Sequence, residues 1–298
     1  MKQTQTKLFD FSDVGLDFCA GSKNKFPEVF KKMLSTGFNP QTASSVSIAG
    51  SQITLTFGVN HGYVADRILK VEATGGFNKE VYIDSVTTNT VTCTVLDGVT
   101  SGLTGTIATK IASLGWEIVY EQANIHVYKM LHIDDTPRYV RFCFQDNASH
   151  RNVVAVCIGK SWEESTGFID DVNALQSTAK ITTPSSATTP RFDLIYSPGS
   201  GYDNWTYSQG FSTFGKGSVV GSAYHFIVCT HNEYERQRIN GILPTVTHAC
   251  DVLEYPILLQ ELYPNETYSS GNFGGNGAAS YGYGHGSIGN IKVYSSLS

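Results

Sequence analysis

Short runs in which apolar and polar residues alternate are the feature that most restricts the fold of this chain. Residues 52–57 (QITLTF) and 90–95 (TVTCTV) place an apolar side chain at every second position. Alternation with period two puts successive side chains on opposite faces of a strand. Between residues 45 and 110, turn-forming residues recur about every 8 to 12 positions, which is typical of sheets built from short strands. This segment therefore predicts a small β-sandwich or barrel.

One helix is predicted just before this segment, within residues 25–38 (KFPEVFKKMLSTGF). Pro27 suits the first turn of a helix, and Gly37 suits its end. Apolar residues four positions apart form one stripe: Val29 with Met33, and Phe30 with Leu34. A helix of roughly ten residues is too short to be stable alone. We therefore expect this stripe to pack on the β module that follows.

A second set of strands is predicted to begin near Gly115 and Trp116. Its members include WEIVYE, ANIHVYKML, RYVRFCFQD, NVVAVCIG, RFDLIYS, SAYHFIVCT and YPILLQEL. Residues 175–191 have few apolar side chains and two prolines, which predicts an exposed loop. The predicted fold is mainly β, with a short N-terminal helix, a small β module and a larger antiparallel β-sandwich-like domain. The expected boundaries are 1–40 for the helical segment, 41–112 for the module and 113–298 for the larger domain.

Composition argues against several classes of partner. The net charge is −5 and only 16% of residues are charged, whereas nucleic-acid binding needs a concentrated basic face. No apolar run approaches the roughly 20 residues of a membrane-spanning helix, and the N-terminus lacks the apolar stretch of a signal peptide. We therefore expect no nucleic-acid partner, no membrane insertion and synthesis in a cytoplasm. The six cysteines lie far apart, and free, packed thiols are expected.

The search for catalytic or cofactor-binding groups predicts none. Gly284-x-Gly286-x-x-Gly289 matches a dinucleotide fingerprint but is not followed by a helix. A tetrahedral metal site could use ligands drawn from His225, Cys229, His231, His248 and Cys250, but knuckle spacing is lacking. The acidic pairs Asp134-Asp135 and Asp170-Asp171 are more typical of turns than of acid–base catalysis. We expect no cofactor, no metal and no catalytic residues.

Two aromatic segments are the predicted interaction residues. The first is a glycine-rich loop that contains Tyr202, Trp205, Tyr207, Phe211 and Phe214. These aromatic side chains could anchor a partner protein, stack on a sugar or simply pack under their own loop. The second is the glycine-rich tail, residues 268–298, with Phe273, Tyr281 and Tyr283. Because glycine loses much backbone entropy on ordering, we expect the tail to become ordered only in an assembly, against an adjacent subunit.

The order of several segments resembles a group of virion structural proteins encoded by tailed bacteriophages. The likeness covers residues 15–165 well and later strands more loosely. In that group a helix ending in a glycine turn precedes a small β module, and a Gly-Trp opening leads into a larger domain with an Asp-Asp-Thr segment. The matching positions are Gly37, His61-Gly62, Phe77-Asn78, Asn89-Thr90, Gly115-Trp116 and Asp134-Asp135-Thr136. The family's Trp-x-Lys-Pro is Trp116-Glu-Ile-Val here, and its Asp-Asp-Thr-Gly-Thr is Asp-Asp-Thr-Pro-Arg.

The resemblance implies a non-enzymatic virion component of the tail, baseplate or neck. Its expected partners are other virion proteins and copies of itself in a symmetric ring or trimer. One alternative is a receptor-binding or glycan-binding tail protein that uses the aromatic loop at 202–214 and contacts a host surface glycan. Another is a carbohydrate hydrolase of the virion that uses two of the acidic residues.

Overall fold

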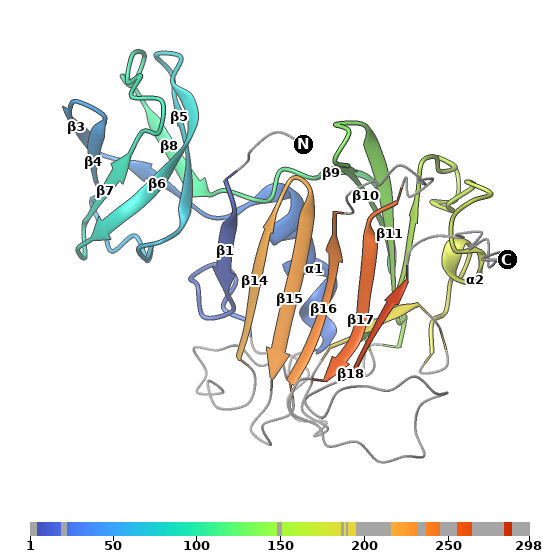
Figure 1. Ribbon diagram of the computed structural model, residues 1–298. Coiled ribbons are helices and arrows are strands. Elements are labelled where there is room, and N and C mark those ends of the chain that lie inside the picture. The colour runs from blue at the N-terminus through green and yellow to red at the C-terminus, as the bar shows by residue number, and fades with distance from the viewer. Residues whose placement is uncertain are drawn as a thin grey trace, which may run out of the picture.

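The computed structural model describes residues 5–18, 23–147, 151–185, 188, 190–194, 216–231, 237–244, 255–263 and 283–287. Its strands form three sheets, and every strand pairing among the described residues is antiparallel (Figure 1). The mainly β class predicted from the alternating pattern is therefore confirmed.

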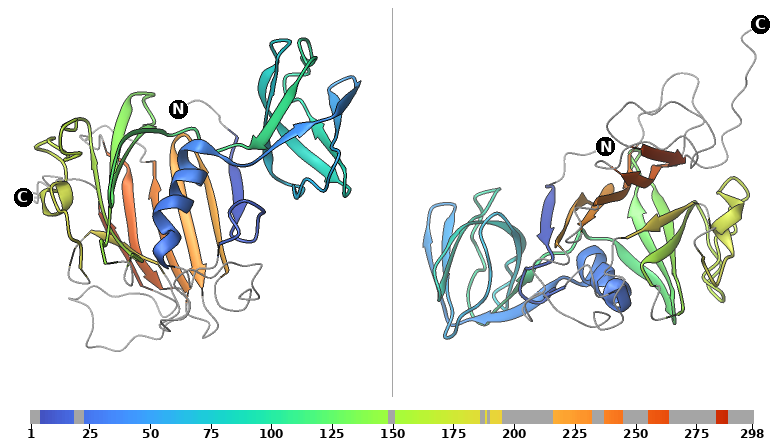
Figure 2. Two further views of the ribbon diagram at one scale, coloured as in Figure 1. Left: turned by 180° about the vertical axis from the view of Figure 1, so that it is seen from behind. Right: turned by 90° about the horizontal axis from the view of Figure 1, so that it is seen from below.

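The seven-stranded sheet contains the segment in which the alternation is clearest. Its strand order is β2 (Phe38–Ala43), β8 (Ile107–Ile111), β5 (Ile68–Ala73), β6 (Asn78–Val86), β7 (Thr90–Thr94), β4 (Gln52–Thr56) and β3 (Ser45–Ala49). Strands β2 and β3 stand at opposite ends of this order, but only Ser44 separates them in the chain. One bent segment thus supplies both ends, and the sheet curls into a barrel (Figures 1 and 2).

The barrel interior holds the apolar half of each alternating run. Val71, Val81, Val91 and Leu55 are fully buried, one from each of four strands. This is the inward face that the period-two pattern predicts. The predicted β3–β4 hairpin, with its turn at Gly50-Ser51, is also confirmed.

A buried histidine ties loops together at one end of the barrel. His61 is 2% exposed, and its Nδ1 accepts a hydrogen bond from the backbone N–H of Tyr63 at 2.9 Å. Its Nε2 must then carry the proton and donate to the carbonyl of Thr87 at 2.9 Å. The Tyr63 hydroxyl in turn donates to the carbonyl of Asn39 at 2.9 Å. His61, one of the positions that match the virion proteins in sequence, therefore has a structural role here.

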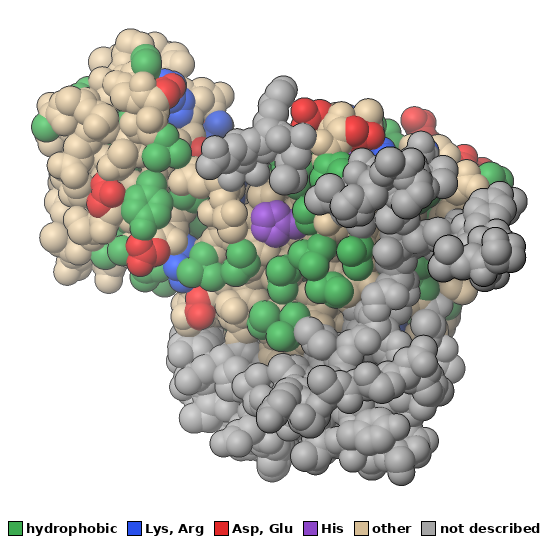
Figure 3. Space-filling view, in the orientation of Figure 1, with side chains coloured by type: hydrophobic (Ala, Val, Ile, Leu, Met, Phe, Trp, Pro, Cys, Tyr) green, Lys and Arg blue, Asp and Glu red, His purple; other side chains and the backbone are tan. Residues whose placement is uncertain are grey.

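Two further sheets form the larger domain. One has the order β1 (Lys7–Asp10), β14 (Lys216–Ser222), β15 (His225–His231), β16 (Gln237–Leu243), β17 (Ile257–Tyr263) and β18 (Tyr283–Ser287). The other has the order β13 (Arg191–Asp193), β12 (Val153–Gly159), β11 (Pro137–Phe144), β10 (Ile125–Leu131) and β9 (Glu117–Gln122). The barrel lies to one side of these two sheets (Figures 1–3).

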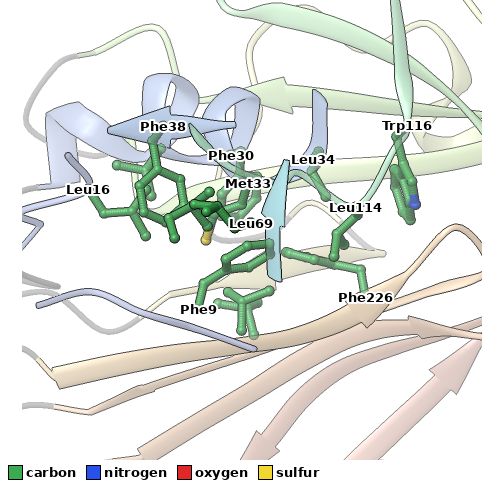
Figure 4. Packing of buried hydrophobic residues seen from close by; sticks show 14 of the residues in the cluster. Phe9, Leu16, Phe30, Met33, Leu34, Phe38, Leu69, Leu114, Trp116 and Phe226 are labelled. Carbon is green, nitrogen blue, oxygen red and sulfur yellow. The ribbon is translucent and has the colours of Figure 1, made fainter. Parts of the chain in front are cut away.

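The predicted helix lies between these two sheets. It comprises a short 3-10 turn η1 (Lys23–Lys25), the helix α1 (Phe26–Lys31) and a π-helical segment η2 (Lys32–Thr36). The ring of Phe30 contacts Phe142 and Phe144 of β11 at centroid distances of 5.6 Å. It also contacts Phe226 of β15 at 5.5 Å. The helix itself is confirmed, but the expectation that Phe30 packs on the β module was wrong (Figure 2). Figure 4 shows Phe30 within the apolar cluster to which Phe226 also belongs.

The π-helical segment connects the helix to the residues that lead into β9 (Glu117–Gln122). The carbonyl of Met33 accepts a hydrogen bond from Leu114 N–H at 2.8 Å, and that of Leu34 accepts one from Trp116 N–H at 2.9 Å. The last carbonyls of a helix have no partner within the helix, so these two can accept from outside donors. Gly37 then ends the helix at φ +71°, where a Cβ would lie 2.4 Å from the carbonyl oxygen of Ile111. Glycine is required at this crossing point.

Two ion pairs hold the barrel against the N-terminal segment. Arg67 donates from Nε and Nη2 to both carboxylate oxygens of Asp13, at 2.8 and 3.0 Å, and both residues are at least nine-tenths buried. Lys7 of β1 donates to Glu80 of β6 at 2.6 Å and to the carbonyl of Ser113. A bidentate arginine–carboxylate pair fixes the orientation of its partners as well as their distance.

One sequence expectation about an irregular segment needs correction. Within the predicted exposed loop 175–191, residues Gln176–Ala179 form the short helix α2, and Thr178 and Ala179 are fully buried. The buried guanidinium of Arg141 binds the carbonyls of Thr178 and Ile181, so backbone acceptors order a segment with few apolar side chains. In the tail, β18 pairs with β17, and the expectation that the tail becomes ordered against an adjacent subunit stays a prediction.

Replacing Phe30 with Ala is expected to lower the free energy of unfolding by about 3 kcal/mol or more, because the fully buried ring leaves a cavity between the sheets. Equilibrium denaturation with urea measures the loss. Leu96, which is 62% exposed, supplies the control, since Leu96→Ala should change stability by less than about 0.5 kcal/mol. Equal effects of the two substitutions would contradict the central position of Phe30.

Replacing Asp13 with Asn should cost about 3 kcal/mol, because it leaves the guanidinium of Arg67 buried without its counter-charge. Adding Arg67→Met to this variant should recover part of the loss, as the unpaired charge is then removed. Lys79→Gln breaks the more exposed pair with Asp97 and should cost less than about 1 kcal/mol. Denaturation of these variants, of Arg67→Met alone and of the unmodified chain tests this, and strictly additive effects of Asp13→Asn and Arg67→Met would contradict the pairing.

Candidate interaction surfaces

The outward face of the six-stranded sheet carries an apolar row. Its members are Leu8, Val220, Ile227, Gly241 and Leu259, which are directly opposite one another from β1 through β14, β15 and β16 to β17. Their sequence neighbours Phe9, Val219, Phe226, Ile242 and Leu258 face the interior and are buried. Both faces of this sheet are therefore apolar along one line that crosses five strands.

The apolar row is accessible to a partner. Leu8 is 38% and Val220 is 36% exposed, while Ile227 and Leu259 are half-buried. The next outward row adds Cys229 and Ile239. Figure 3 shows apolar side chains gathered on this face of the molecule. Antiparallel sheets with one face on the core usually present polar residues on the other. A contiguous apolar patch on such a face marks a surface that binds another molecule.

The aromatic residues predicted to bind partners lie almost entirely outside the described residues. This applies to Tyr202, Trp205, Tyr207, Phe211, Phe214, Phe273 and Tyr281. Tyr283 begins β18, opposite Tyr263 of β17. The sequence search missed the apolar row, although the run Phe226-Ile227-Val228 carries its signal. Three consecutive apolar residues on a strand place apolar side chains on both faces.

The His/Cys candidates do not form a metal centre among the described residues, where no group of three or more suitable ligands comes together. His225 and Cys229 share a face of β15 but are four residues apart, or about 13 Å along a strand. Zinc ligands lie about 2.0 to 2.3 Å from the ion, so these two side chains cannot share one. The Nδ1 of His225 instead lies 2.8 Å from Ser222 Oγ. His248 and Cys250 lie outside the described residues.

The acidic pairs serve turns and loop contacts. Asp134 accepts hydrogen bonds from the N–H and hydroxyl of Thr136 at 2.9 and 2.6 Å. Burial alone would raise the pKa of Asp171, but hydrogen bonds from the Tyr255 hydroxyl and two backbone N–H groups together lower it. A carboxyl group that acts as a general acid needs a raised pKa. The partners of Asp135 and Asp170 are Tyr224 and Ser161.

The described cysteines are free, as predicted: Cys93, Cys143, Cys157 and Cys229. Burial raises the pKa of Cys93 and of Cys157 to about 12, and that of Cys143 to about 11. Because the thiolate is the reactive form, these three are inert packing residues. Cys19 and Cys250 lie outside the described residues.

A groove on the outer face of the barrel was also missed by the sequence search. It has a volume of about 350 Å³ and crosses β2, β8 and β5; its lining consists of Pro40, Gln41, Thr42, Lys70, Glu72, Ala108, Thr109 and Lys110. None of these described lining residues is aromatic, so the groove offers no ring on which a sugar could stack. The available signal in the sequence was a lysine on each of two strands, Lys70 and Lys110, which lie on antiparallel neighbours.

Comparison with protein-family models, with curated proteins and with solved structures finds no match. Among the described residues, no helix is long and apolar enough to cross a membrane.

His126 is a buried histidine whose pKa is shifted toward the neutral form. It is 4% exposed on β10, with Nδ1 3.1 Å from the hydroxyl of Tyr128. Burial lowers its pKa to about 4, although the carboxylate of Glu121, 3.9 Å from Nε2, opposes the shift. The folded protein therefore holds this ring neutral between pH 7 and pH 5.

Acid should destabilise the fold through His126. Its folded pKa of about 4 lies below the unfolded value of about 6.5, so the unfolded chain binds the extra proton as the pH falls. Stability is therefore lost below about pH 6.5, by about 2 kcal/mol at pH 5, and the loss levels off near pH 4. Urea denaturation at pH 7 and pH 5 should show a smaller difference in His126→Gln than in the unmodified chain. Equal differences would contradict this.

Proposed function

We propose that this chain is a non-enzymatic structural component of a tailed-bacteriophage virion, in the tail, baseplate or neck. It acts by binding copies of itself and other virion proteins. The observation that carries the assembly role is the apolar row, which crosses five strands of the six-stranded sheet without a charged residue. The resemblance of residues 15–165 to virion structural proteins supports the location in a virion.

The geometry of the apolar row supports protein binding over ligand binding. A small-molecule site is concave, and polar groups converge in it. The row instead follows the outward side of a sheet, where its side chains stand roughly perpendicular to the strands. Stable protein–protein interfaces bury about 1,600 Å² in total, and their centres are depleted of charge. A sheet face with an uncharged apolar row across five strands suits the centre of such an interface.

The carboxylates of the predicted acidic pairs support the non-enzymatic part of the proposal. Each accepts hydrogen bonds from its own turn or from a neighbouring loop. A glycosidase needs two carboxyl groups about 5 to 10 Å apart across a substrate cleft, one of them with a raised pKa. The pKa values of Asp134 and Asp171 are lowered instead.

Val220→Asp tests the proposed role. The charge should abolish self-association of the purified chain, measured by sedimentation over a concentration series, and reduce its content in particles assembled in host cells by tenfold or more. The matched control is Val172→Asp, because Val172 is 79% exposed on a loop away from the apolar row. This variant should assemble normally. Circular dichroism checks that both variants fold.

Two results would overturn the proposal. One is the absence of the chain from purified tailed particles of its source, determined by mass spectrometry. The other is equal incorporation of Val220→Asp and of the unmodified chain into particles, which would show that the apolar row is not an assembly contact.

A further inference from the structure

Two lysines lie directly opposite each other in the barrel groove. Lys70 of β5 and Lys110 of β8 are register partners, and both side chains are on the outward face and half-buried. Cβ atoms of directly opposite residues are about 4.5 to 5.5 Å apart, and like charges in these positions destabilise a sheet. An anion bound in this groove would relieve the repulsion.

Glu72 lies on the same strand as Lys70 and Glu80 on the next one, but neither carboxylate is paired with Lys70 or Lys110. Neither lysine has a hydrogen-bond or ion-pair partner among the described residues. Glu80 is the register partner of Lys70 on its other side, but its carboxylate binds Lys7 at 2.6 Å. Burial is the largest cause that lowers the pKa of Lys7, Glu80 opposes it, and the positive charge of Lys70 lowers it further. The carboxylate beside Lys70 is therefore already engaged by Lys7.

The rest of the lining limits the kind of anion. Glu72 lies one pair further along the same face, opposite Ala108, and would repel a continuous polyanion such as a nucleic-acid backbone. A single carboxylate over the two lysines avoids Glu72. The side chains of Gln41, Thr42 and Glu72 then offer acceptors for N–H groups of an extended peptide.

We propose that this groove binds an acidic side chain, on an extended segment of a partner protein, between Lys70 and Lys110. The inference rests on the proposed function, in which the chain assembles with other virion proteins, and it names the chemistry of one contact. The carboxylate accepts hydrogen bonds from both ammonium groups. Its negative charge offsets the repulsion between the two lysines and attracts both of them to the partner.

A titration of the full chain tests the groove. A capped tri-glutamate peptide is added at low ionic strength to protein labelled with ¹⁵N-lysine. The amide signals of Lys70 and Lys110 should shift and saturate, and the affinity should fall at least tenfold in Lys110→Gln. Lys79→Gln is the matched control, because Lys79 of the same barrel already has a carboxylate partner in Asp97 at 2.6 Å. Its affinity for the peptide should be unchanged.

Thermal unfolding of the same variants at low salt adds an independent readout. Lys110→Gln removes a repulsion, so its Tm should equal or exceed that of the unmodified chain, whereas Lys79→Gln removes an attraction and should lower it. A lower Tm in Lys110→Gln would overturn the unpaired-charge argument. If inorganic phosphate binds as tightly as the peptide, the groove does not select a peptide carboxylate, and the proposal is wrong. The proposal is also wrong if neither probe produces a shift that saturates.

The test separates this inference from the proposed function. If the chain binds the peptide but is absent from tailed particles, the virion assignment is contradicted, whereas the binding of an acidic side chain in the groove is supported. Incorporation into particles with no binding of the peptide would contradict the groove alone.

Discussion

The contact of Phe30 with rings from both sheets is the interaction on which the larger domain depends. The two sheets meet at an angle, and α1 with η2 fills the space between them (Figure 2). Without this ring, Phe142 of β11 and Phe226 of β15 would lose a shared partner. The N-terminal segment is therefore part of the larger domain, to which it also contributes β1. The barrel, residues 38–111, is consequently an insertion between η2 and β9.

This arrangement fixes how the barrel is held. An insertion has two covalent connections, and here Phe38 and Ile111 pair where the chain enters and leaves. The Asp13–Arg67 and Lys7–Glu80 pairs add two attachments from the N-terminal segment. Relative motion of two domains is the usual expectation where their interface is small and polar. Four attachments, one of them a buried bidentate pair, oppose such motion, so the barrel is presented at a set angle.

Local patterns allowed most of the strands to be predicted, because alternation and turn residues act over a few positions. The hairpin at Gly50-Ser51 and the helix end at Gly37 are examples. The position of the helix could not be predicted in this way. Its apolar stripe requires a partner but does not specify one, and Phe226 is distant in sequence. Burial of Thr178 likewise depends on a guanidinium from another strand, which a polar segment does not reveal. The aromatic candidates at 202–214 lie outside the described residues, so they stay predictions.

The two surfaces differ in chemistry and lie on different parts of the chain, which bears on the symmetry of an assembly. A self-complementary contact through the apolar row alone would close a two-fold dimer and leave the groove unused. A ring needs two different surfaces on each subunit that meet in head-to-tail order. An apolar sheet face and a cationic groove cannot bind the same patch of a neighbour, since one excludes charge and the other requires it. The row and the groove therefore do not bind each other, and in the proposed assembly each would need its own complementary surface on a neighbouring protein.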